Sequence, residues 1–534
     1  MTRRRWVLLG VLAISTLVLY AWHLGNSPPY LAADEVAFAL QAYSIATTAH
    51  DLSGRLLPLY FQMGPLGETS WFHPAVVYFS VPFVSVLPFS EAAVRAPTAV
   101  VGVVDVVLVF FVARRVFGAR LAWLAALLLA LTPAHFMLSR LTADYLYPVP
   151  FVLGWLLCLL VFLDGVNPRW LFGCTVCLGF GVYSYIASVV MMPLYLLITL
   201  SVVARRSREP IRSGGIAIAG FVLPLILLPV WLLVHPQVVG ATLARYEQIQ
   251  AVPVAGATTG LSLDGALREL RRPAHFSGVV RRLSLYWYFF DPGYLFVTGG
   301  YANPLNSTRH TAVFLSPLLV FIPAGLWRVA RSTSTLGQRL ILVGFLTAPV
   351  AALLVPEPYA VDREAALLPF GALLATMGVS ALGSSHRALV ARSRAVLLVV
   401  ALLQFAWFLH DYDGSYRGEV AFWFGFDHRG AVEEVIARTE RQSVPAIYLT
   451  RARDSAIEAY WRFGLIKAHR QDLLSRTVYY DPAGLDAAAV PGGSLIIAQC
   501  DDRDMERRVG AGEFRKVADI PEIADPPRFM VLQR

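Results

Sequence analysis

Residues 3–24 read RRRWVLLGVLAISTLVLYAWHL, three arginines followed by an apolar run, and the acid pair Asp34-Glu35 follows ten residues later. The apolar run is long enough to cross a bilayer about 30 Å thick as a helix. Because it is longer than the apolar core of most signal peptides, we interpret it as a retained first span, although Leu31-Ala32-Ala33 faintly resembles a cleavage site. The stretch predicts a chain that enters a membrane at once and places acids beside its far surface.

The composition extends this interpretation to most of the chain. Of 534 residues, 57% are hydrophobic and only 15% are charged, and the mean hydropathy is +0.58, which excludes a set of soluble domains. By contrast, 37 of the 81 charged side chains lie in residues 411–534. We therefore predict a membrane domain over 1–410 and a soluble domain over 411–534.

The formal charge of +9 gives no reason to expect a nucleic acid partner, because the arginines stand between apolar segments where membrane topology explains them. Four cysteines do not form a disulfide framework. Cys174 and Cys177 make a CxxC pair inside an apolar segment, which is more typical of helix packing than of a metal site. No cofactor and no metal site is expected, although a divalent metal is not excluded.

Ten further apolar segments follow the first, which gives eleven predicted spans. They cover 96–113, 121–138, 148–163, 170–186, 188–204, 215–234, 311–327, 340–355, 365–382 and 395–410. If the N-terminus lies inside, alternate connections on that side carry 17 arginines against two acids, Asp164 and Glu209. This matches the positive-inside rule and predicts an extracytoplasmic tail.

The first outer loop, residues 25–95, is predicted to fold at the membrane surface. Residues 74–89 are apolar but contain three prolines, and a span there would invert the arginine pattern, so we expect a juxtamembrane or re-entrant helix. Residues 34–50 predict a moderately amphipathic helix. In the tail, helices are expected at 430–442, 454–465 and 504–511 and strands at 446–450, 494–499 and 529–532, which indicates a small α/β domain.

Asp34 and Glu35 allow two interpretations. They could be a helix N-cap followed by a first-turn acid, or Asp34 could be a general base facing a substrate held in the membrane. Arg140 and Asp144, spaced i, i+4, are expected to share a helical face, either as a salt bridge or with the arginine free for a phosphate.

Further polar candidates lie on the same outer side of the membrane. They are His73, Arg95, Arg309, His310, Tyr359 and Arg363. Ionisable residues that converge from several loops on one rim of an apolar body are typical of a site for a lipid-linked anion.

The order of these motifs resembles the GT-C glycosyltransferases, and within them the bacterial family 39 related to protein O-mannosyltransferases and the lipid A aminoarabinose transferase. The motifs are Asp34-Glu35, Phe72-His73-Pro74, Glu91-Ala-Ala-Val-Arg95, Arg140 to Asp144, Phe290 to Phe296, Arg309-His310 and Pro358 to Arg363. The similarity extends to about residue 420. Two departures concern the donor: Ala75 follows His73-Pro74 where many relatives have a second proline, and Tyr359 stands where relatives often have histidine.

The resemblance implies a polyprenyl-phosphate monosaccharide as donor and a protein, lipid or glycan hydroxyl as acceptor. It implies Asp34 as the catalytic base beside Glu35, and inversion at the anomeric carbon. Residues expected to bind the donor phosphate are Arg95, Arg140, Arg309, His310 and Arg363, while His73, Asp144 and Tyr359 would orient the substrates.

Two other functions are compatible with the sequence. A lipid or polysaccharide transporter or flippase would place charges near the middle of several spans, but Asp105 is the one such charge we find. A sensor whose tail binds a ligand is the other alternative.

Overall fold

The computed structural model describes most of the chain. The described residues are 2–63, 71–165, 167–238, 285–299, 304, 307–331, 334–354, 359–383, 388–451, 454–481, 484–524 and 526–534. Arg387 and Pro358, which entered the topology and motif predictions, lie outside them. By their contacts the residues form two compact units. The helical unit comprises Met1–Leu19, Val100–Ser139 and Asp144–Phe408, and the mixed unit comprises Tyr20–Ala99, Arg140–Ala143 and Leu409–Arg534.

A helix stands at each of the eleven predicted spans. They are α1 (Arg3–Ala21), α4 (Glu91–Phe117), α5 (Ala119–Ala130) with α6 (Pro133–Leu138), α7 (Pro148–Gly165), α8 (Pro168–Gly181), α9 (Ser188–Arg206), α10 (Pro210–Val222) with η1 (Leu223–Leu225) and α11 (Leu228–Val234), α15 (Leu318–Ala330), α16 (Leu336–Thr347) with η3 (Ala348–Leu354), α17 (Leu367–Gly383) and α18 (Ala388–Asp413). Among the described residues, seven helical stretches are long and apolar enough to cross a membrane. The prediction of a polytopic helical membrane protein is therefore confirmed.

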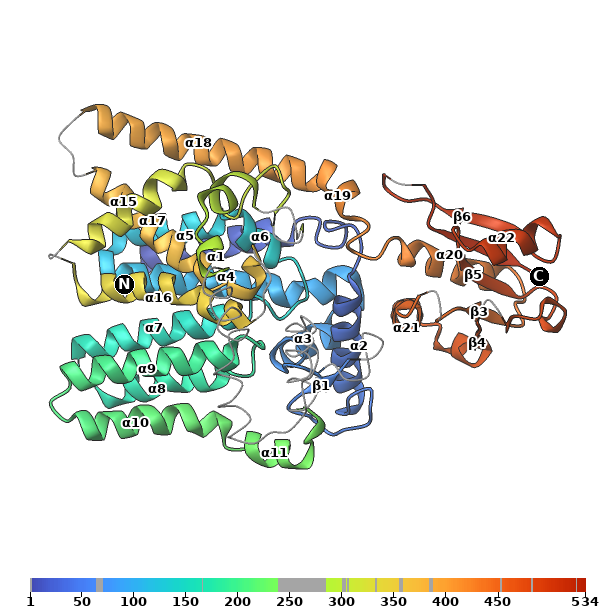
Figure 1. The fold of residues 1–534 in the computed structure, drawn as a ribbon, viewed down its shortest axis with the longest axis horizontal. Coiled ribbons are helices and arrows are strands. Elements are labelled where there is room, and N and C mark those ends of the chain that lie inside the picture. Colours follow the sequence, from blue (N-terminus) through green and yellow to red (C-terminus); the bar gives the residue numbers. More distant parts are fainter. Residues whose placement is uncertain are drawn as a thin grey trace, which may run out of the picture. The chain divides into compact units, whose positions relative to one another are not determined.

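Within the helical unit, α7, α8, α9 and α10 lie side by side (Figure 1), and α15 packs along α17. The α15–α17 contact depends on two glycines. A Cβ atom on Gly325 would collide with the carbonyl of Leu374, and one on Gly378 with the carbonyl of Phe321. Small residues allow the two backbones to touch, which is the usual basis of helix association inside a membrane.

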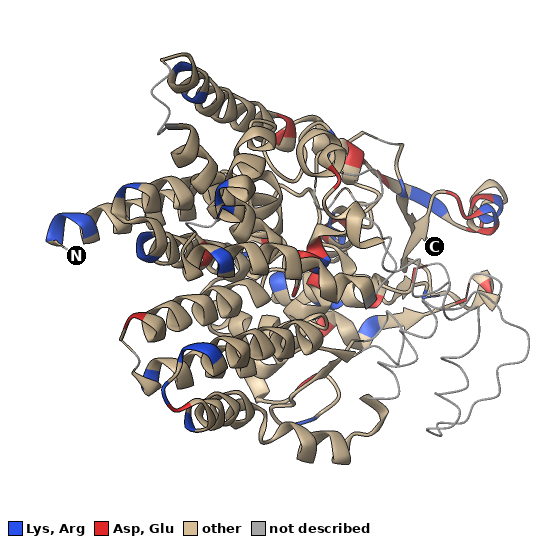
Figure 2. Cartoon of the chain, turned by 60° about the vertical axis from the view of Figure 1, so that its left-hand side comes forward, with Lys and Arg blue, Asp and Glu red and all other residues tan. Residues whose placement is uncertain are grey.

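The arginine pattern has a counterpart in the arrangement of the helix ends. Several helices carry basic residues at the end that lies on the side of the N-terminus (Figure 2). In addition, Arg115 near the end of α4, Asp164 near the end of α7, Arg206 at the end of α9 and Thr335 just before α16 line one cavity. All four positions belong to connections predicted to share the inner side, so the cavity supports that part of the predicted topology.

In the mixed unit, the first outer loop folds around α2 (Ala33–Thr48). The two-residue strands β1 (Phe61–Gln62) and β2 (Trp71–Phe72) pair antiparallel, and α3 (Ala75–Val86) follows. α2 packs against α3 and against α21 (Ile457–Lys467) of the tail. Because two helices cover it, α2 is buried on more sides than the predicted amphipathic stripe required.

The tail is an α/β fold, as predicted. After α19 (Ser415–Val420), α20 (His428–Arg441), α21 and α22 (Arg503–Gly510) accompany a five-stranded sheet with the order β4-β3-β5-β7-β6. The strands are β3 (Ile447–Leu449), β4 (Thr477–Tyr479), β5 (Leu495–Gln499), β6 (Arg515–Ile520) and β7 (Phe529–Gln533). β4, β3 and β5 run parallel, and β7 and β6 join antiparallel. The sequence missed the two edge strands, β4 and β6.

Candidate functional site

The acid pair lies in the first turn of α2, but neither acid is the N-cap. Ala32 occupies the N-cap position, and the Glu35 carboxylate accepts a hydrogen bond from the Ala32 N–H at 3.0 Å. The interpretation of Asp34 as the N-cap is therefore wrong, because Asp34 is the second residue inside the helix. Asp34 is half-buried, whereas Glu35 is 2% exposed. The two neighbours consequently differ in their access to a substrate.

Arg95 holds Glu35 in a bidentate ion pair. Its Nε donates to Glu35 Oε1 at 2.9 Å and its Nη2 to Glu35 Oε2 at 2.8 Å. The backbone N–H of Thr142 also donates to Oε1 at 2.9 Å. Such a fork is the strongest geometry available to an arginine and a carboxylate. With the bond from Ala32, each Glu35 oxygen accepts two hydrogen bonds, so Glu35 holds the start of the helix in place. Its predicted catalytic role stays a prediction.

The other donors of Arg95 bind the chain that precedes α2. Nη1 donates to the carbonyls of Leu24 and Pro28, at 3.2 and 2.8 Å, and Nη2 donates to that of Tyr30 at 2.5 Å. The side chain is fully buried. A guanidinium has five N–H groups, and here all are used. These bonds argue against a role of Arg95 in binding the donor phosphate, which stays a prediction.

Arg140 has a similar role. It is 1% exposed and donates to the carbonyls of Tyr20 and Ser27, both at 2.7 Å, while its guanidinium lies 5.4 Å from the ring centre of Tyr412. The turn that carries it, between α6 and α7, is not helical, so the expected shared helical face with Asp144 is wrong. Arg140 is directed at backbone carbonyls rather than at a phosphate. Together, Arg95 and Arg140 hold residues 20–30 and so fix the position of Asp34.

The tail contributes to the same position. Tyr460 of α21 donates its hydroxyl to the carbonyl of Leu31 at 2.7 Å. The ring of His428 stacks on that of Tyr460 at 3.9 Å with an angle of 7° between the planes, and His428 Nε2 lies 2.5 Å from Asp454. Lys467 forms ion pairs with Glu91 and Glu433. Sequence reasoning missed Tyr460, since nothing in the tail's pattern identifies its partner in the first loop.

His73 lies between β2 and α3 and is 5% exposed. Its ring contacts that of Tyr60 at 5.0 Å, and its Nε2 has no hydrogen-bond partner among the described residues. Burial lowers the pKa of His73 to about 3. The side chain is therefore neutral near pH 7, and it can orient a substrate only as a neutral hydrogen-bonding group.

In the helical unit, Arg363 donates to the hydroxyl of Tyr185 at 2.9 Å. Asp144 and Asp362 also act electrostatically on Tyr185, and the ring of Tyr145 contacts that of Tyr185. Two predicted site residues, Asp144 and Arg363, therefore meet around a tyrosine that the sequence did not identify. The signal available in the sequence was that Tyr185 lies at the outer end of a predicted span.

Two neighbouring groups complete this part of the helical unit. Tyr359 adopts a left-handed conformation, with φ of 61°, and contacts the rings of Tyr288 and Tyr294. Glu364 is 1% exposed, and burial together with the charge of Asp362 raises the pKa of Glu364 well above its usual range. Neither carboxyl oxygen of Glu364 has a hydrogen-bond partner among the described residues, a feature that its sequence context did not reveal.

The predicted pair Arg309-His310 lies on a separate turn of the helical unit. Arg309 is half-buried with φ of 64°, and its N–H donates to the Ser307 hydroxyl at 2.9 Å. His310 is exposed, with its ring 6.2 Å from that of Trp407. Their predicted role in binding phosphate remains a prediction.

Asp105, the charge found in the middle of a span, lies 3.4 Å from His135, and both side chains are fully buried. One oxygen of Asp105 thus faces a histidine within the bundle, while the other has no hydrogen-bond partner among the described residues. In the part of the chain that the structure describes, no group of three or more His, Cys, Asp or Glu residues could hold a metal ion.

The structure is similar to solved membrane enzymes along its whole length. ArnT from Cupriavidus metallidurans, bound to undecaprenyl phosphate, matches with a TM-score of 0.59 at 12% identity, over 99% of this chain and 98% of that one. The apo form of ArnT matches with a TM-score of 0.56 at 13% identity, over 100% and 98% of the chains. The oligosaccharyltransferase AglB from Archaeoglobus fulgidus, in complex with an inhibitory peptide and a dolichol-phosphate, matches with 0.50 at 14% identity, over 86% and 64%.

These likenesses show the fold, which is that of the GT-C class. A family model described as dolichyl-phosphate-mannose-protein mannosyltransferase matches residues 72–233. The match agrees with the class predicted from the motifs, and the apolar helices together with the fold show a multi-pass membrane protein. No protein with a curated description matches the sequence.

Proposed function

We propose that the enzyme transfers a monosaccharide from a polyprenyl-phosphate donor to an acceptor hydroxyl on the extracytoplasmic side of the membrane, with inversion. The observation that carries the proposal is the difference between the two acids of α2. Glu35 is enclosed by four hydrogen bonds, whereas Asp34, one residue away on a rigid turn, stays half-buried. A half-buried carboxylate held by its surroundings suits a general base.

Asp34 would take the proton of the acceptor hydroxyl. The acceptor oxygen would then attack the anomeric carbon, the bond from that carbon to the phosphate oxygen would break, and polyprenyl phosphate would leave. A single displacement with no carboxylate nucleophile gives inversion. Since Arg95 and Arg140 are directed at carbonyls, the remaining candidates for the leaving phosphate are Arg309, His310 and Arg363, with Asp144, His73 and Tyr359 as orienting groups.

We propose the donor and the acceptor only as chemical classes. The lipid phosphates in the similar structures support a lipid-linked donor, and the peptide in AglB supports a protein as one acceptor class, beside lipids and glycans. Guanidinium groups on the phosphate would make a metal unnecessary, so we expect transfer to persist in EDTA.

The test compares Asp34→Asn with Glu35→Gln in proteoliposomes supplied with polyprenyl-phosphate hexoses and membrane extracts as acceptor. Asp34→Asn should lower turnover by about 10² or more with unchanged donor binding, the usual contribution of a general base. Retention of more than about a tenth of the wild-type turnover would remove Asp34 from this role. Movement of labelled donor across the bilayer without transfer would favour a flippase.

A further inference from the structure

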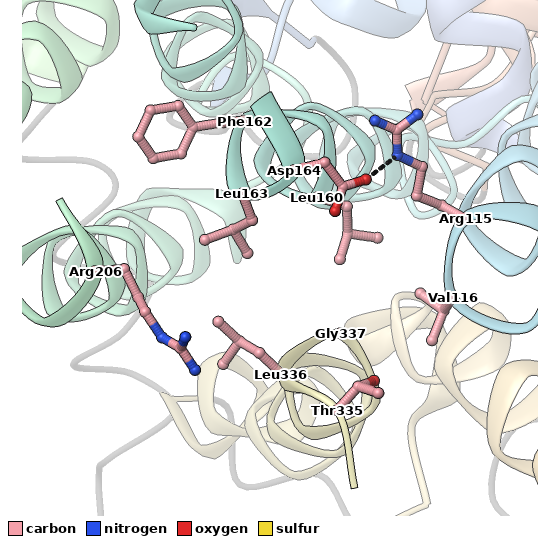
Figure 3. Close-up of a pocket in the computed structure, with 10 residues that line it drawn as sticks. All are labelled: Arg115, Val116, Leu160, Phe162, Leu163, Asp164, Arg206, Thr335, Leu336 and Gly337. Atoms are coloured by element: carbon pink, nitrogen blue, oxygen red, sulfur yellow. Dashed lines mark ion pairs between the residues drawn. The ribbon is translucent and has the colours of Figure 1, made fainter. Parts of the chain in front are cut away.

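A cavity of about 510 Å³ lies among helix ends of the helical unit (Figure 3). It is bordered by Arg115 of α4, Asp164 of α7 and Arg206 of α9, and by the first turn of α16. α7 separates it from the cluster around Asp144, Tyr185 and Arg363, because that cluster lies beside the start of α7 and the cavity beside its end. A helix of 18 residues is about 27 Å long. The cavity is therefore distinct from that cluster, which contains Asp144 and Arg363 of the residues proposed to act in sugar transfer.

The charges around the cavity do not balance. Arg115 Nε lies 2.8 Å from the Asp164 carboxylate, whereas Arg206 forms no ion pair among the described residues. Figure 3 shows the Arg206 guanidinium directed toward the space between α9 and α16, away from the Arg115–Asp164 pair. Two guanidinium groups against one carboxylate leave a net positive cavity, which suits a monoanion.

Apart from Thr335, the rest of the lining is apolar. Leu163 and Leu336 project into the space beside the arginines (Figure 3). α16 approaches closely because it has no side chain at Gly337, where a Cβ would lie 3.1 Å from Leu160 and 3.2 Å from Val116. The cavity thus combines a cationic edge with a hydrocarbon wall.

Its location selects one kind of anion. α7 and α9 are candidate membrane spans that end at Gly165 and Arg206, so the cavity lies at a membrane surface. The leucine side chains would make no favourable contact with a small soluble anion, whereas a phospholipid carries its phosphate beside its own acyl chains. Basic pockets between transmembrane helices bind acidic lipid head groups on this principle, and arginine recognises a phosphate with two parallel hydrogen bonds.

We propose that this cavity binds the phosphate of an anionic phospholipid, with Arg206 as the main contact and Arg115 as the second. The lipid would join the ends of α4, α7, α9 and α16. Because the cavity is about a helix length from the cluster of Asp144, Tyr185 and Arg363, the lipid would act on stability rather than on the chemical step.

The experiment uses the full-length enzyme in nanodiscs of phosphatidylcholine titrated with phosphatidylglycerol, with bound lipid counted by native mass spectrometry. Wild type should retain phosphatidylglycerol selectively, and Arg206→Gln should weaken this binding about tenfold. Arg208→Gln is the matched control, since Arg208 is exposed on the same connection but does not line the cavity, and it should change binding less than about twofold.

Three results would overturn the proposal. The first is unchanged binding in Arg206→Gln, and the second is an equal loss in Arg208→Gln, which would mean general surface charge. The third is displacement of the lipid by millimolar inorganic phosphate, which would mean an anion site with no lipid selectivity. A loss of thermal stabilisation by phosphatidylglycerol in Arg206→Gln, with normal folding in phosphatidylcholine, would support the site independently of enzyme activity.

Discussion

The hydroxyl of Tyr460 donates a hydrogen bond of 2.7 Å to the carbonyl of Leu31, three residues before Asp34. This bond joins a helix of the C-terminal region to the segment that carries the proposed base. It lies in an apolar cluster that includes Val36, Leu40 and Phe463. The tail therefore takes part in positioning the first loop.

Tyr460→Phe should lower turnover several-fold with a loss of stability of about 1 kcal/mol, the net value of one hydrogen bond. The matched control is Tyr480→Phe, because the Tyr480 hydroxyl has no hydrogen-bond partner among the described residues. Turnover and thermal unfolding should be measured for both variants. Equal turnover in the two would show that the bond to Leu31 does not position Asp34.

Glu35→Gln should destabilise the enzyme by about 3–5 kcal/mol, because it leaves the charge of Arg95 buried without its partner. Asp34→Asn should be nearly neutral for stability, since Asp34 is half-buried at the start of a helix. Thermal unfolding in detergent distinguishes the two. Similar melting temperatures for both variants would contradict the assignment of Glu35 to the framework.

The four arginines first grouped as phosphate ligands should separate into two pairs. Arg95→Lys and Arg140→Lys should lower stability, since lysine cannot replace a fork that binds several carbonyls. Arg309→Lys and Arg363→Lys should instead raise KM for the donor with little change in melting temperature. The experiment is a donor titration beside a melting curve for each variant, and a rise in KM confined to the first pair would reverse the assignment.

Acid should destabilise the enzyme through His73. Its pKa is lowered to about 3 in the folded protein, whereas an unfolded histidine has a pKa of about 6.5. The unfolded state therefore binds the extra proton, and stability falls as pH decreases from about 6.5 toward 3, by up to about 1.4 kcal/mol per pH unit. Melting temperatures at pH 7 and pH 5 should differ more for wild type than for His73→Gln. An equal difference would mean that His73 is accessible to solvent.

The topology can be tested with single-cysteine variants in a cysteine-free background and a membrane-impermeant thiol reagent. We expect labelling of His50→Cys and Glu440→Cys in intact cells and protection of Arg208→Cys until lysis. All three positions are exposed in the structure. Labelling of Arg208→Cys from outside would reverse the predicted orientation and, with it, the compartment of the transfer reaction.

Sequence reasoning predicted the helices because hydropathy is a local property. Each apolar run had to become a helix to satisfy its backbone in lipid, and the tail's buried strands β3, β5 and β7 have clear apolar runs. β4 has three residues, and β6 reads RKVADI, with its polar residues on an edge strand. Strands of this kind are held by their neighbours and have little local signal.

The candidate site was predicted less well, for a physical reason. The acid at the start of α2 was located because it follows an apolar run. The partners of Arg95 and Arg140, however, are backbone carbonyls, and an acceptor that every residue carries leaves no trace in a sequence. Arginines near the membrane rim were therefore taken for phosphate ligands. Thr142 was missed for the same reason, since its backbone N–H makes the contact with Glu35.

Arg95 and Arg140 bind backbone carbonyls, and this affects which substitutions residues 20–30 can tolerate. Side chains at positions 20, 24, 27 and 28 take no part in the bonds that Arg95 and Arg140 make there. Tyr20, Leu24, Ser27 and Pro28 are themselves buried, so substitutions of similar size at these positions should give active enzyme more often than replacements at 35, 95 or 140, where the side chain itself makes the bonds. The position of Asp34 is thus less sensitive to substitutions in residues 20–28 than to substitutions of the side chains that hold this segment.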